Sequence, residues 1–438
     1  MMHLMGFTLN SAMNHTIASW SHPRNNIGYD FARPEVWQQM SRTLERGCFD
    51  GFFFADVWAA PDNYKSRRDE ALRHAIQFPV HDPLLLIPML ATVTSNLGFA
   101  ATLSVTYYQP YMTARKLSTL DHLTGGRIGW NIVTSLNKAE AQNLGLDDMI
   151  PHDQRYERAE EYMDVCYKLW SSWEPDAVVM DRVTGTFTDP AKVHPINHKG
   201  KWFSCPGFSP VTPSPQQKPV LFQAGASGAG RDFCAKHAEA ALIIQNSPEA
   251  IERVAGDLKQ RALKAGRKEG DLKVLCGIQA IVGSTEREAR EKQQEINERV
   301  PYEAGLALLS GHANYDLSQH DPDSWPHDIP AVQGAQGLFD ALVAEHNVKL
   351  TLREIGKIYG ASVAMPQIVG TAEQVADRME SLVNDAGIDG FNITPTYTPS
   401  SFDEFVDLVV PILQDRGVHR KQYEGTTLRE NLQQTDIG

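Results

Sequence analysis

Residues 121–137, DHLTGGRIGWNIVTSLN, change from one kind of secondary structure to another twice. The first residues complete an apolar-periodic helix, and Gly125-Gly126 supplies the left-handed conformation that ends it. RIGWNIV then predicts a buried strand, which stops at the mostly small polar residues 134–137. A helix that enters a strand through a glycine turn is half of an α/β repeat, and parallel α/β folds bind ligands at the C-terminal ends of their strands. We therefore expect this strand end to face a bound cofactor.

Seven further runs predict strands, and helical patterns separate them in regular alternation. The eight expected strands are residues 3–8, 50–56, 97–105, 127–133, 219–224, 240–245, 274–283 and 389–395. Eight alternating strands predict a single (β/α)₈ TIM barrel over residues 1–438, with insertions after strand four (171–218) and strand seven (300–369). We expect a helix-like part at 333–355, closed by Gly356, in the second insertion. A doubly wound open sheet also fits the alternation, but it would gather its polar strand ends at one switch point.

The composition is that of an ordinary globular protein. The chain has 438 residues, of which 42% are hydrophobic and 22% charged. No long apolar run and no secretion signal is present, so we expect a cytoplasmic protein. Five widely spread cysteines without a C-x-x-C pair predict neither a disulfide framework nor a zinc knuckle. The formal net charge of −13 disfavours nucleic acid or an anionic membrane as a partner.

Polar residues recur at or near the ends of the predicted strands, as the barrel interpretation requires. They are Asp56, Thr102, Thr134 and Ser227. The Asp56 carboxylate could accept a hydrogen bond from a ring N–H of a ligand, although a helix cap or a loop-fixing contact explains it as well. The two threonines are also ordinary β-branched strand residues.

The turn Gly225–Gly230, GASGAG, follows a strand and opens a helix, so its backbone N–H groups could hold a phosphate. Its G-x-x-G-x-G spacing is not the dinucleotide fingerprint, and Ala229 stands where a nucleophile elbow needs glycine. A merely tight turn explains it equally well. His152 and Tyr156 lie one helical turn apart near the expected barrel mouth, where they could also hold a phosphate. Capping by Asp153 with a core-facing Tyr156 is the alternative.

The other clustered histidines do not predict a metal site. Pro195 lies between His194 and His198, so their i, i+4 spacing indicates loop residues rather than a helical zinc pair. His312, His320 and His327 have aspartates nearby, but they fall in an aperiodic stretch and no H-E-x-x-H motif exists.

Five stretches together resemble one known family. They are HDQRYERAEEYMDVCYKLWSSWEPDA, DHLTGGRIGWNIVTSLN, PVLFQAGASGAGR, DGFNITP and QYEGTTLRENL. The chain is similar to the nitrilotriacetate/dibenzothiophene-sulfone monooxygenase family of the bacterial luciferase-like flavin monooxygenase superfamily. The resemblance covers nearly the whole chain in order, and it is weakest at residues 10–29 and 300–330.

The resemblance implies a (β/α)₈ barrel that uses reduced FMN, FMNH₂, delivered by a separate NAD(P)H-dependent flavin reductase. By similarity, Asp56, Thr102, Asn131 and Thr134 should contact FMN, the last two against the isoalloxazine ring. His152, Tyr156, Ser227 and Gly228 match the positions around the ribityl phosphate. Relatives usually form homodimers or homotetramers.

The implied activity is oxygenation of a small organic substrate by O₂ through a flavin C4a-hydroperoxide, commonly with cleavage of a C–S or C–N bond. The catalytic residue is unknown, no metal is expected, and residues 300–369 with the first loop would form a lid that keeps water out. Residues 10–29 contain only one cation, Arg24, and residues 300–330 contain none, which favours a less anionic substrate such as a sulfur compound or an aromatic.

Two alternatives remain at this point. A deazaflavin-dependent oxidoreductase of the same superfamily would transfer hydride without O₂. A barrel hydrolase or a phosphate-ligand binding protein could also carry a Gly-rich turn and polar strand ends. A hydrolase would need a metal cluster or a nucleophile elbow, and the sequence has neither.

Overall fold

A parallel sheet closes on itself to form a barrel in the computed structural model, which describes residues 1–135, 137–225, 227–325 and 350–434. The barrel strands are β1 (His3–Leu9), β2 (Gly51–Ala55), β3 (Gly98–Ser104), β4 (Ile128–Val133), β9 (Val220–Gln223), β10 (Ala240–Ile243), β11 (Lys273–Val282) and β13 (Gly390–Ile393). Closure comes from β1, which pairs with both β2 and β13, and from β10, which pairs with β11. These pairings confirm the eight-stranded barrel and exclude the open doubly wound sheet.

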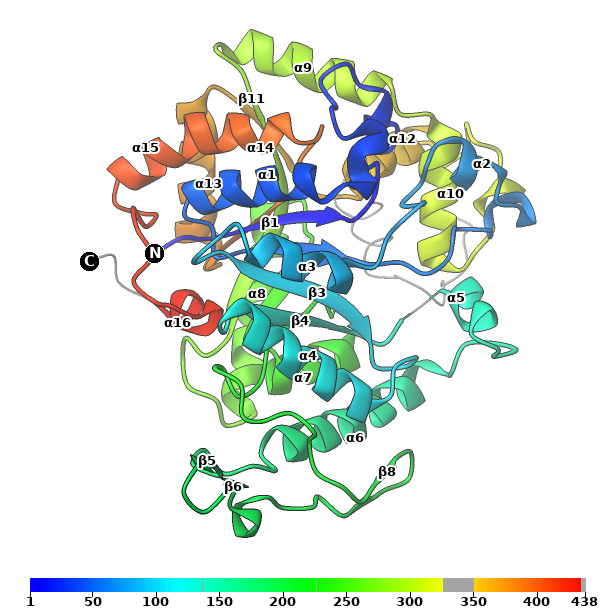
Figure 1. The fold of residues 1–438 in the computed structure, drawn as a ribbon. Helices are drawn as coiled ribbons and strands as arrows, with labels where there is room; N and C mark the ends of the chain where they lie inside the picture. The colour runs from blue at the N-terminus through cyan, green and yellow to red at the C-terminus, as the bar shows by residue number, and fades with distance from the viewer. Residues whose placement is uncertain (136, 226, 326–349, 435–438) are drawn as a thin grey trace.

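Helices surround the barrel, as Figure 1 shows. They are α1 (Pro34–Arg46), α2 (Asp69–Arg73), α3 (Pro83–Ala91), α4 (Pro110–Thr124), α5 (Lys138–Asn143), α6 (His152–Trp170), α7 (Gly228–His237), α8 (Pro248–Lys264), α9 (Glu286–Glu298), α13 (Ala372–Ala386), α14 (Ser400–Glu404) and α15 (Val410–Asp415). A π-helical turn, Phe405–Val409, joins α14 to α15, so residues 400–415 form one continuous helical segment with an irregular centre. The main core lies between the strands and these helices, and a smaller apolar cluster fills the barrel itself.

The stretch 121–137 has the predicted form where it is described. Helix α4 ends at Gly125, with φ +64°, and Gly126 follows with φ +85°. Both values lie in the left-handed region that only glycine adopts without strain. The buried Asp121 carboxylate holds the turn to a later segment, because it accepts hydrogen bonds from the backbone and side chain of Gln216 at 2.8 and 2.7 Å. Strand β4 then runs buried almost to its end.

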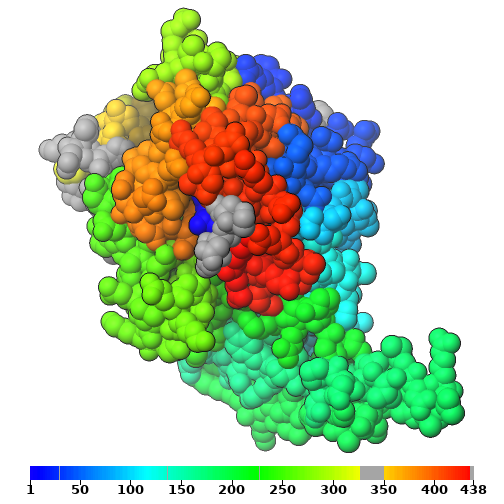
Figure 2. Space-filling model, turned by 90° about the vertical axis from the view of Figure 1, so that its left-hand side faces the viewer, coloured from blue at the N-terminus to red at the C-terminus, as the bar shows by residue number. Residues whose placement is uncertain are grey.

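Residues 171–218 form an arm outside the barrel. Two short hairpins make up its regular structure: β5 (Val178–Asp181) with β6 (Thr186–Thr188), and β7 (His198–Lys199) with β8 (Ser204–Cys205). The arm follows α6 and extends away from the body of the molecule (Figures 1 and 2). His194 contacts Glu174 and His198 contacts Glu161, each through a ring nitrogen. His194 lies in a loop, as predicted, whereas His198 lies on the two-residue strand β7. Both histidines pair with carboxylates.

Residues 300–369 are more regular than the sequence indicated. Helix α10 (Tyr302–Ala313) was not predicted and includes His312, which we expected in an aperiodic stretch, and β12 (Gln367–Gly370) adds an unexpected ninth strand beside β11. We predicted from Gly356 that the helix would end there. This prediction is wrong, because helix α12 (Leu352–Ser362) continues through that glycine. Instead, a Cβ built on Gly305 would lie 1.7 Å from the Gly356 carbonyl oxygen, so the glycines allow α10 and α12 to cross closely. Most of the predicted helix 333–355 and His327 lie outside the described residues.

The N-terminal end of the barrel is closed by a short helix near the C-terminal end of the chain. Leu428 and Leu432 of α16 (Leu428–Gln433) join the apolar cluster inside the barrel, together with Phe53 and Phe222. Gly98, at the start of β3, makes room for this helix, because a Cβ there would lie 2.5 Å from Leu428 Cδ1. Figure 2 shows the C-terminal residues, in red and orange, gathered around the N-terminus at this end.

Within the described ranges, no helix combines the length and the apolar character needed to cross a membrane. All five cysteines are buried and free, as the absence of a disulfide framework in the sequence predicted.

Candidate active site

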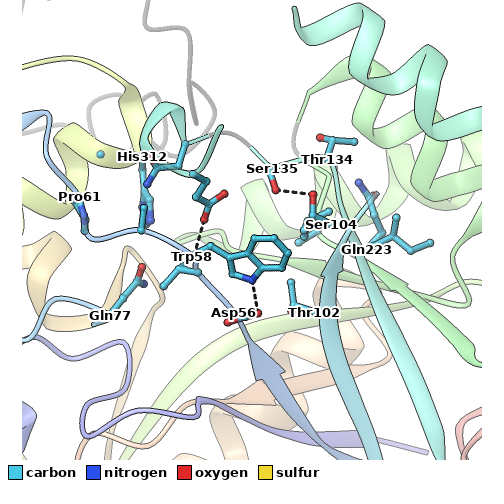
Figure 3. Close-up of a pocket in the computed structure, with 18 of the residues that line it drawn as sticks. Asp56, Trp58, Pro61, Gln77, Thr102, Ser104, Thr134, Ser135, Gln223 and His312 are labelled. Atoms are coloured by element: carbon cyan, nitrogen blue, oxygen red, sulfur yellow. Dashed lines mark hydrogen bonds between the residues drawn. The ribbon is translucent and has the colours of Figure 1, made fainter. Parts of the chain in front are cut away.

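A cavity of about 250 Å³ opens at the C-terminal ends of the barrel strands (Figure 3). Its walls come from the loop after β2, from the ends of β3, β4 and β9, and from helix α10. The lining residues are Asp56, Val57, Trp58, Ala59, Pro61, Gln77, Thr102, Ser104, Ile132, Val133, Thr134, Ser135, Asn137, Glu140, Tyr156, Gln223, Ala224, Gly311 and His312. The barrel therefore has one end closed by α16 and the other hollowed by this cavity, which is the end where the sequence placed the ligand.

Two carboxyl groups hold Trp58 at the edge of the cavity. Asp56 Oδ2 accepts a hydrogen bond from the indole N–H of Trp58 at 2.7 Å, and Glu140 Oε1 accepts one from its backbone N–H at 3.0 Å (Figure 3). Burial raises the pKa of Asp56 to about 7, and Asp82 and Glu140 act in the same direction, against the hydrogen bond from Trp58. Burial also raises the pKa of Glu140. The loop-fixing alternative for Asp56 thus holds in this structure, yet its carboxyl group also faces the cavity.

The floor of the cavity contains polar groups that are only half satisfied. Thr102 and Asn131 lie opposite each other in the register of β3 and β4. The Thr102 hydroxyl donates to the Phe54 carbonyl at 2.9 Å and accepts from Asn131 Nδ2 at 3.0 Å. Asn131 Oδ1 and Gln223 Oε1 are buried acceptors that have no hydrogen-bond partner among the described residues. An unsatisfied buried acceptor costs about 1–3 kcal/mol, so these two oxygens favour a ligand that brings N–H donors.

The end of β4 is held to the segment after β3 by side-chain hydrogen bonds. The Thr134 carbonyl oxygen accepts from the Thr106 hydroxyl at 2.7 Å, and Thr134 itself lines the cavity. Ser135 has φ +54°, and its hydroxyl donates to the Ser104 hydroxyl at 2.8 Å. Ser135 belongs to the strand end that we expected to face a cofactor, whereas Ser104 was missed, although it stands two residues after Thr102 and so lies on the same face of β3.

The four residues expected at the phosphate gather at the start of α7. His152 Nε2 and Ser227 Oγ lie 3.2 Å apart, and the rings of His152 and Tyr156 pack at 5.1 Å. The Ser227 hydroxyl caps the helix by accepting from the Gly230 N–H at 3.0 Å. A side chain added at Gly228 would meet nothing within 4 Å, so the helix N-terminus is open there. Backbone N–H groups at such an end, with the helix dipole, favour an anion.

All eight residues predicted for cofactor binding thus belong to one region. Asp56, Thr102, Thr134 and Tyr156 line the cavity, and Asn131 lies one hydrogen bond away from it. His152, Ser227 and Gly228 do not line it but adjoin it beside Tyr156. Their contact with a cofactor stays a prediction.

His312 brings a second kind of polar group to the cavity. It lies in the last turn of α10, and its Nδ1 is 2.5 Å from the buried Tyr359 hydroxyl. Burial lowers the pKa of His312 to about 4, so the imidazole is neutral at physiological pH. Among the described residues no group of three or more His, Cys, Asp or Glu side chains could hold a metal ion. His312 was missed because its segment was taken as aperiodic.

Trp58 and Gln77 were missed as well, because both lie on loops where no strand or helix period marks them. Only the position of Trp58, two residues after Asp56, could have drawn attention to it.

The barrel and its cavity define an enzyme of the (β/α)₈ class with its ligand site at the C-terminal strand ends. The family model for luciferase-like monooxygenases matches residues 10–390 of the chain. The protein therefore belongs to the luciferase-like monooxygenase family, which confirms the resemblance found in the sequence, and it is a monooxygenase of that family.

Similar proteins span nearly the whole chain. It is 41% identical to the long-chain alkane monooxygenase of Geobacillus thermodenitrificans (strain NG80-2), over 98% of this chain and 93% of that protein. It is 40% identical to the dimethyl-sulfide monooxygenase of Hyphomicrobium sulfonivorans, over 99% and 91%. It is also 40% identical to a dibenzothiophene-sulfone monooxygenase of Rhodococcus erythropolis, over 98% and 96%.

Solved structures agree with these sequences. The long-chain alkane monooxygenase structure has a TM-score of 0.90 and 41% identity, covering 98% of this chain and 95% of that one. Riboflavin lyase, solved with modified FMN and its substrate riboflavin, has a TM-score of 0.91 and 33% identity, covering 100% and 96%. An F420-dependent secondary alcohol dehydrogenase is only 14% identical, with a TM-score of 0.58, so its likeness shows the fold alone.

Proposed function

We propose that this protein is the oxygenase component of a two-component, FMNH₂-dependent monooxygenase that oxygenates a small uncharged organic substrate, foremost a sulfur compound, with C–S cleavage. A separate NAD(P)H:flavin reductase supplies the FMNH₂. Family membership supports the reaction type, and the riboflavin lyase structure, which holds modified FMN, supports the flavin. The deazaflavin alternative has only a likeness of fold behind it.

The observation that carries the flavin assignment is the pair of unpartnered acceptors, Asn131 Oδ1 and Gln223 Oε1, on the cavity floor. The isoalloxazine ring carries N–H donors on a flat, largely apolar frame, which such a floor suits. Asp56, Thr102, Asn131 and Thr134 would hold the ring, and His152, Tyr156, Ser227 and Gly228 would hold the phosphate at the start of α7. When bound, reduced flavin supplies the activation of O₂.

The chain itself supplies orientation, exclusion of water and one place for a proton. Trp58, Ala59 and Pro61 form an apolar wall, and α10 closes the same end with Gly311 and His312. This supports residues 300–369 as the element that keeps water from the reacting centre. The Asp56 carboxyl group, with a pKa of about 7, holds a proton in the acidic range and releases it near neutral pH.

The charge of the cavity supports an uncharged substrate. The described residues that line it include the carboxyl groups of Asp56 and Glu140 but no Lys or Arg. Arg24, the one cation of the first loop, donates to the Tyr397 hydroxyl at 3.3 Å and to Glu404 at 3.2 Å instead. A polyanionic substrate would meet uncompensated carboxyl groups here. Dimethyl sulfide, dibenzothiophene sulfone and long-chain alkanes, named by three relatives, are uncharged, whereas nitrilotriacetate, named by a relative at 39% identity, is a polyanion.

Oxygen uptake tests this proposal. The purified protein with FMN, NADH and a flavin reductase should bind reduced FMN tightly under anaerobic conditions, and it should consume O₂ in proportion to one of a panel of sulfones, thioethers, alkanes and amines. Substrate-independent peroxide as the sole product across the panel, together with weak binding of reduced FMN, would contradict it.

A further inference from the structure

Gln77 is an unusual residue in the wall of the cavity. It lies in the loop between α2 and α3 and has φ +52°, a left-handed conformation that costs a non-glycine residue about 1 kcal/mol or more. The nearby Ala75 has φ +53°. The Gln77 residue is only 5% exposed and lines the cavity on the same side as Pro61 and His312 (Figure 3). The fold thus holds a strained backbone where it presents this one side chain to the cavity.

No hydrogen bond joins the carboxamide of Gln77 to a residue that the structure describes, and the residue lines the cavity. A buried amide of this kind can donate two hydrogen bonds and accept two. Such groups are normally satisfied by protein, water or ligand, and the cavity is where Gln77 can meet such a partner. Gln77 is therefore poised for a group that enters the cavity.

The rest of the cavity indicates which kind of group this is. The carboxyl groups of Asp56 and Glu140 also line the cavity, and the oxygens of Asn131 and Gln223 are those assigned above to the N–H groups of the flavin. The indole N–H of Trp58 is already donated to Asp56. A substrate oxygen on the side of Pro61 and His312 needs a hydrogen-bond donor from that part of the wall. The N–H groups of Gln77 meet that need, at the end of the cavity next to the neutral His312.

We infer that Gln77 determines substrate specificity: its carboxamide N–H donates to an S=O or C=O oxygen of an uncharged substrate and orients the adjacent carbon for oxygenation. The inference rests on the proposed function and refines its substrate class. Substrates with such an oxygen are held at Gln77, whereas thioethers and alkanes of equal size depend on the apolar wall of Trp58, Ala59 and Pro61 alone.

The test compares three proteins, wild type, Gln77→Leu and Gln77→Glu, on a dialkyl sulfone, the matching sulfoxide and the matching thioether. Leucine keeps the approximate volume without polar atoms, and glutamate keeps the shape without the N–H donors. Both changes should raise KM for the sulfone and the sulfoxide about tenfold, the value of one net hydrogen bond. KM for the thioether should change less than twofold, and reduced-FMN affinity should stay at the wild-type value. Calorimetric binding of the sulfone to the protein loaded with oxidised FMN gives the same comparison without turnover.

Gln39→Leu, the same substitution on the exposed face of α1, is the matched control and should leave every parameter unchanged. Equal losses for sulfone and thioether, or full retention of sulfone affinity in Gln77→Glu, would overturn the donor role while the monooxygenase assignment stands. If wild-type protein oxygenates no member of the panel, the proposed function itself fails.

Discussion

Strand β2 carries an aspartate at each end, and the two carboxyl groups behave in opposite ways. Asp50, at the sealed end, would have its pKa raised by burial, but Arg420 at 2.6 Å and His3 at 3.0 Å outweigh this and hold the pKa well below its usual range. Asp56, at the open end, pairs with no cation in the described part of the chain, and burial raises its pKa to about 7. The sealed end is built to be stable, and the open end keeps a carboxyl group at a cost in stability, as ligand sites commonly do.

Removal of Arg420 should have the largest effect on stability. Arg420→Met leaves the Asp50 charge buried without its main partner, and the free energy of unfolding should fall by about 3–5 kcal/mol. Urea denaturation monitored by tryptophan fluorescence measures it. Lys421→Met, which breaks an exposed pair with Asp415, should cost no more than about 1 kcal/mol. Adding Asp50→Asn to Arg420→Met should recover part of the loss; no recovery would mean that the ion pair is not the cause.

Loss of apolar packing between α16 and the barrel should have the second-largest effect on stability. Leu428→Ala removes a fully buried side chain between the glycines of β3 and β4, at an expected cost of about 3 kcal/mol. Because α16 lies at the opposite end of the barrel from the cavity, the folded variant should bind FMN as tightly as wild type. A large loss of FMN affinity at unchanged stability would show that the two ends are not independent.

The pH dependence of stability separates the two aspartates. A raised folded-state pKa means that the folded protein binds the Asp56 proton more tightly than the unfolded chain does. Stability from this group is therefore lost as pH rises from about 4 through 7. Asp50 has the opposite sign, since its contribution is present above about pH 4 and is lost as pH falls below it. Asp56→Asn should stabilise the protein by on the order of 2 kcal/mol at pH 8 and little at pH 4.

Chemical denaturation at several pH values gives this difference directly. Asp147→Asn, a change at an exposed position near α5, should not alter the profile. A pH-independent gain for Asp56→Asn would indicate that its pKa is not raised.

The smallest expected effect concerns the start of α7. Ser227→Gly removes the hydroxyl expected at the FMN phosphate, and glycine is the substitution that costs a helix cap least, only a few tenths of a kcal/mol. The dissociation constant for FMN should rise about tenfold in a fluorescence titration. Ser247→Gly makes the same change at the cap of α8 and should leave FMN affinity intact. Equal FMN affinity in both variants would remove Ser227 from the site.

Local patterns were sufficient for the barrel, because each strand is an apolar run closed by a polar residue or a glycine. They failed at α10, where YEAGLALLSGHA is apolar on nearly every side and is buried almost throughout. A helix of this kind has no amphipathic period to detect. Gly356 led to a wrong helix end, because glycine often ends a helix. Here it instead lets a second helix cross closely.

The site residues likewise differ in whether a sequence pattern marks them. Asp56, Thr102 and Thr134 could be found because strand ends are visible in a sequence. Gln77 could not, because its significance lies in a left-handed backbone angle and a missing partner, which only the three-dimensional arrangement reveals.

The sealed end also constrains how the chain reaches its native state. Arg420 and Asp50 are 370 positions apart in the sequence, and contacts of such separation form late in folding because the intervening chain must already be ordered. Until α16 docks, the aromatic floor of the barrel, including Phe53 and Phe222, lies open to solvent. A partly folded chain at that stage exposes an apolar surface that promotes aggregation. The yield of refolding should therefore fall as protein concentration rises, even though the native barrel is stable.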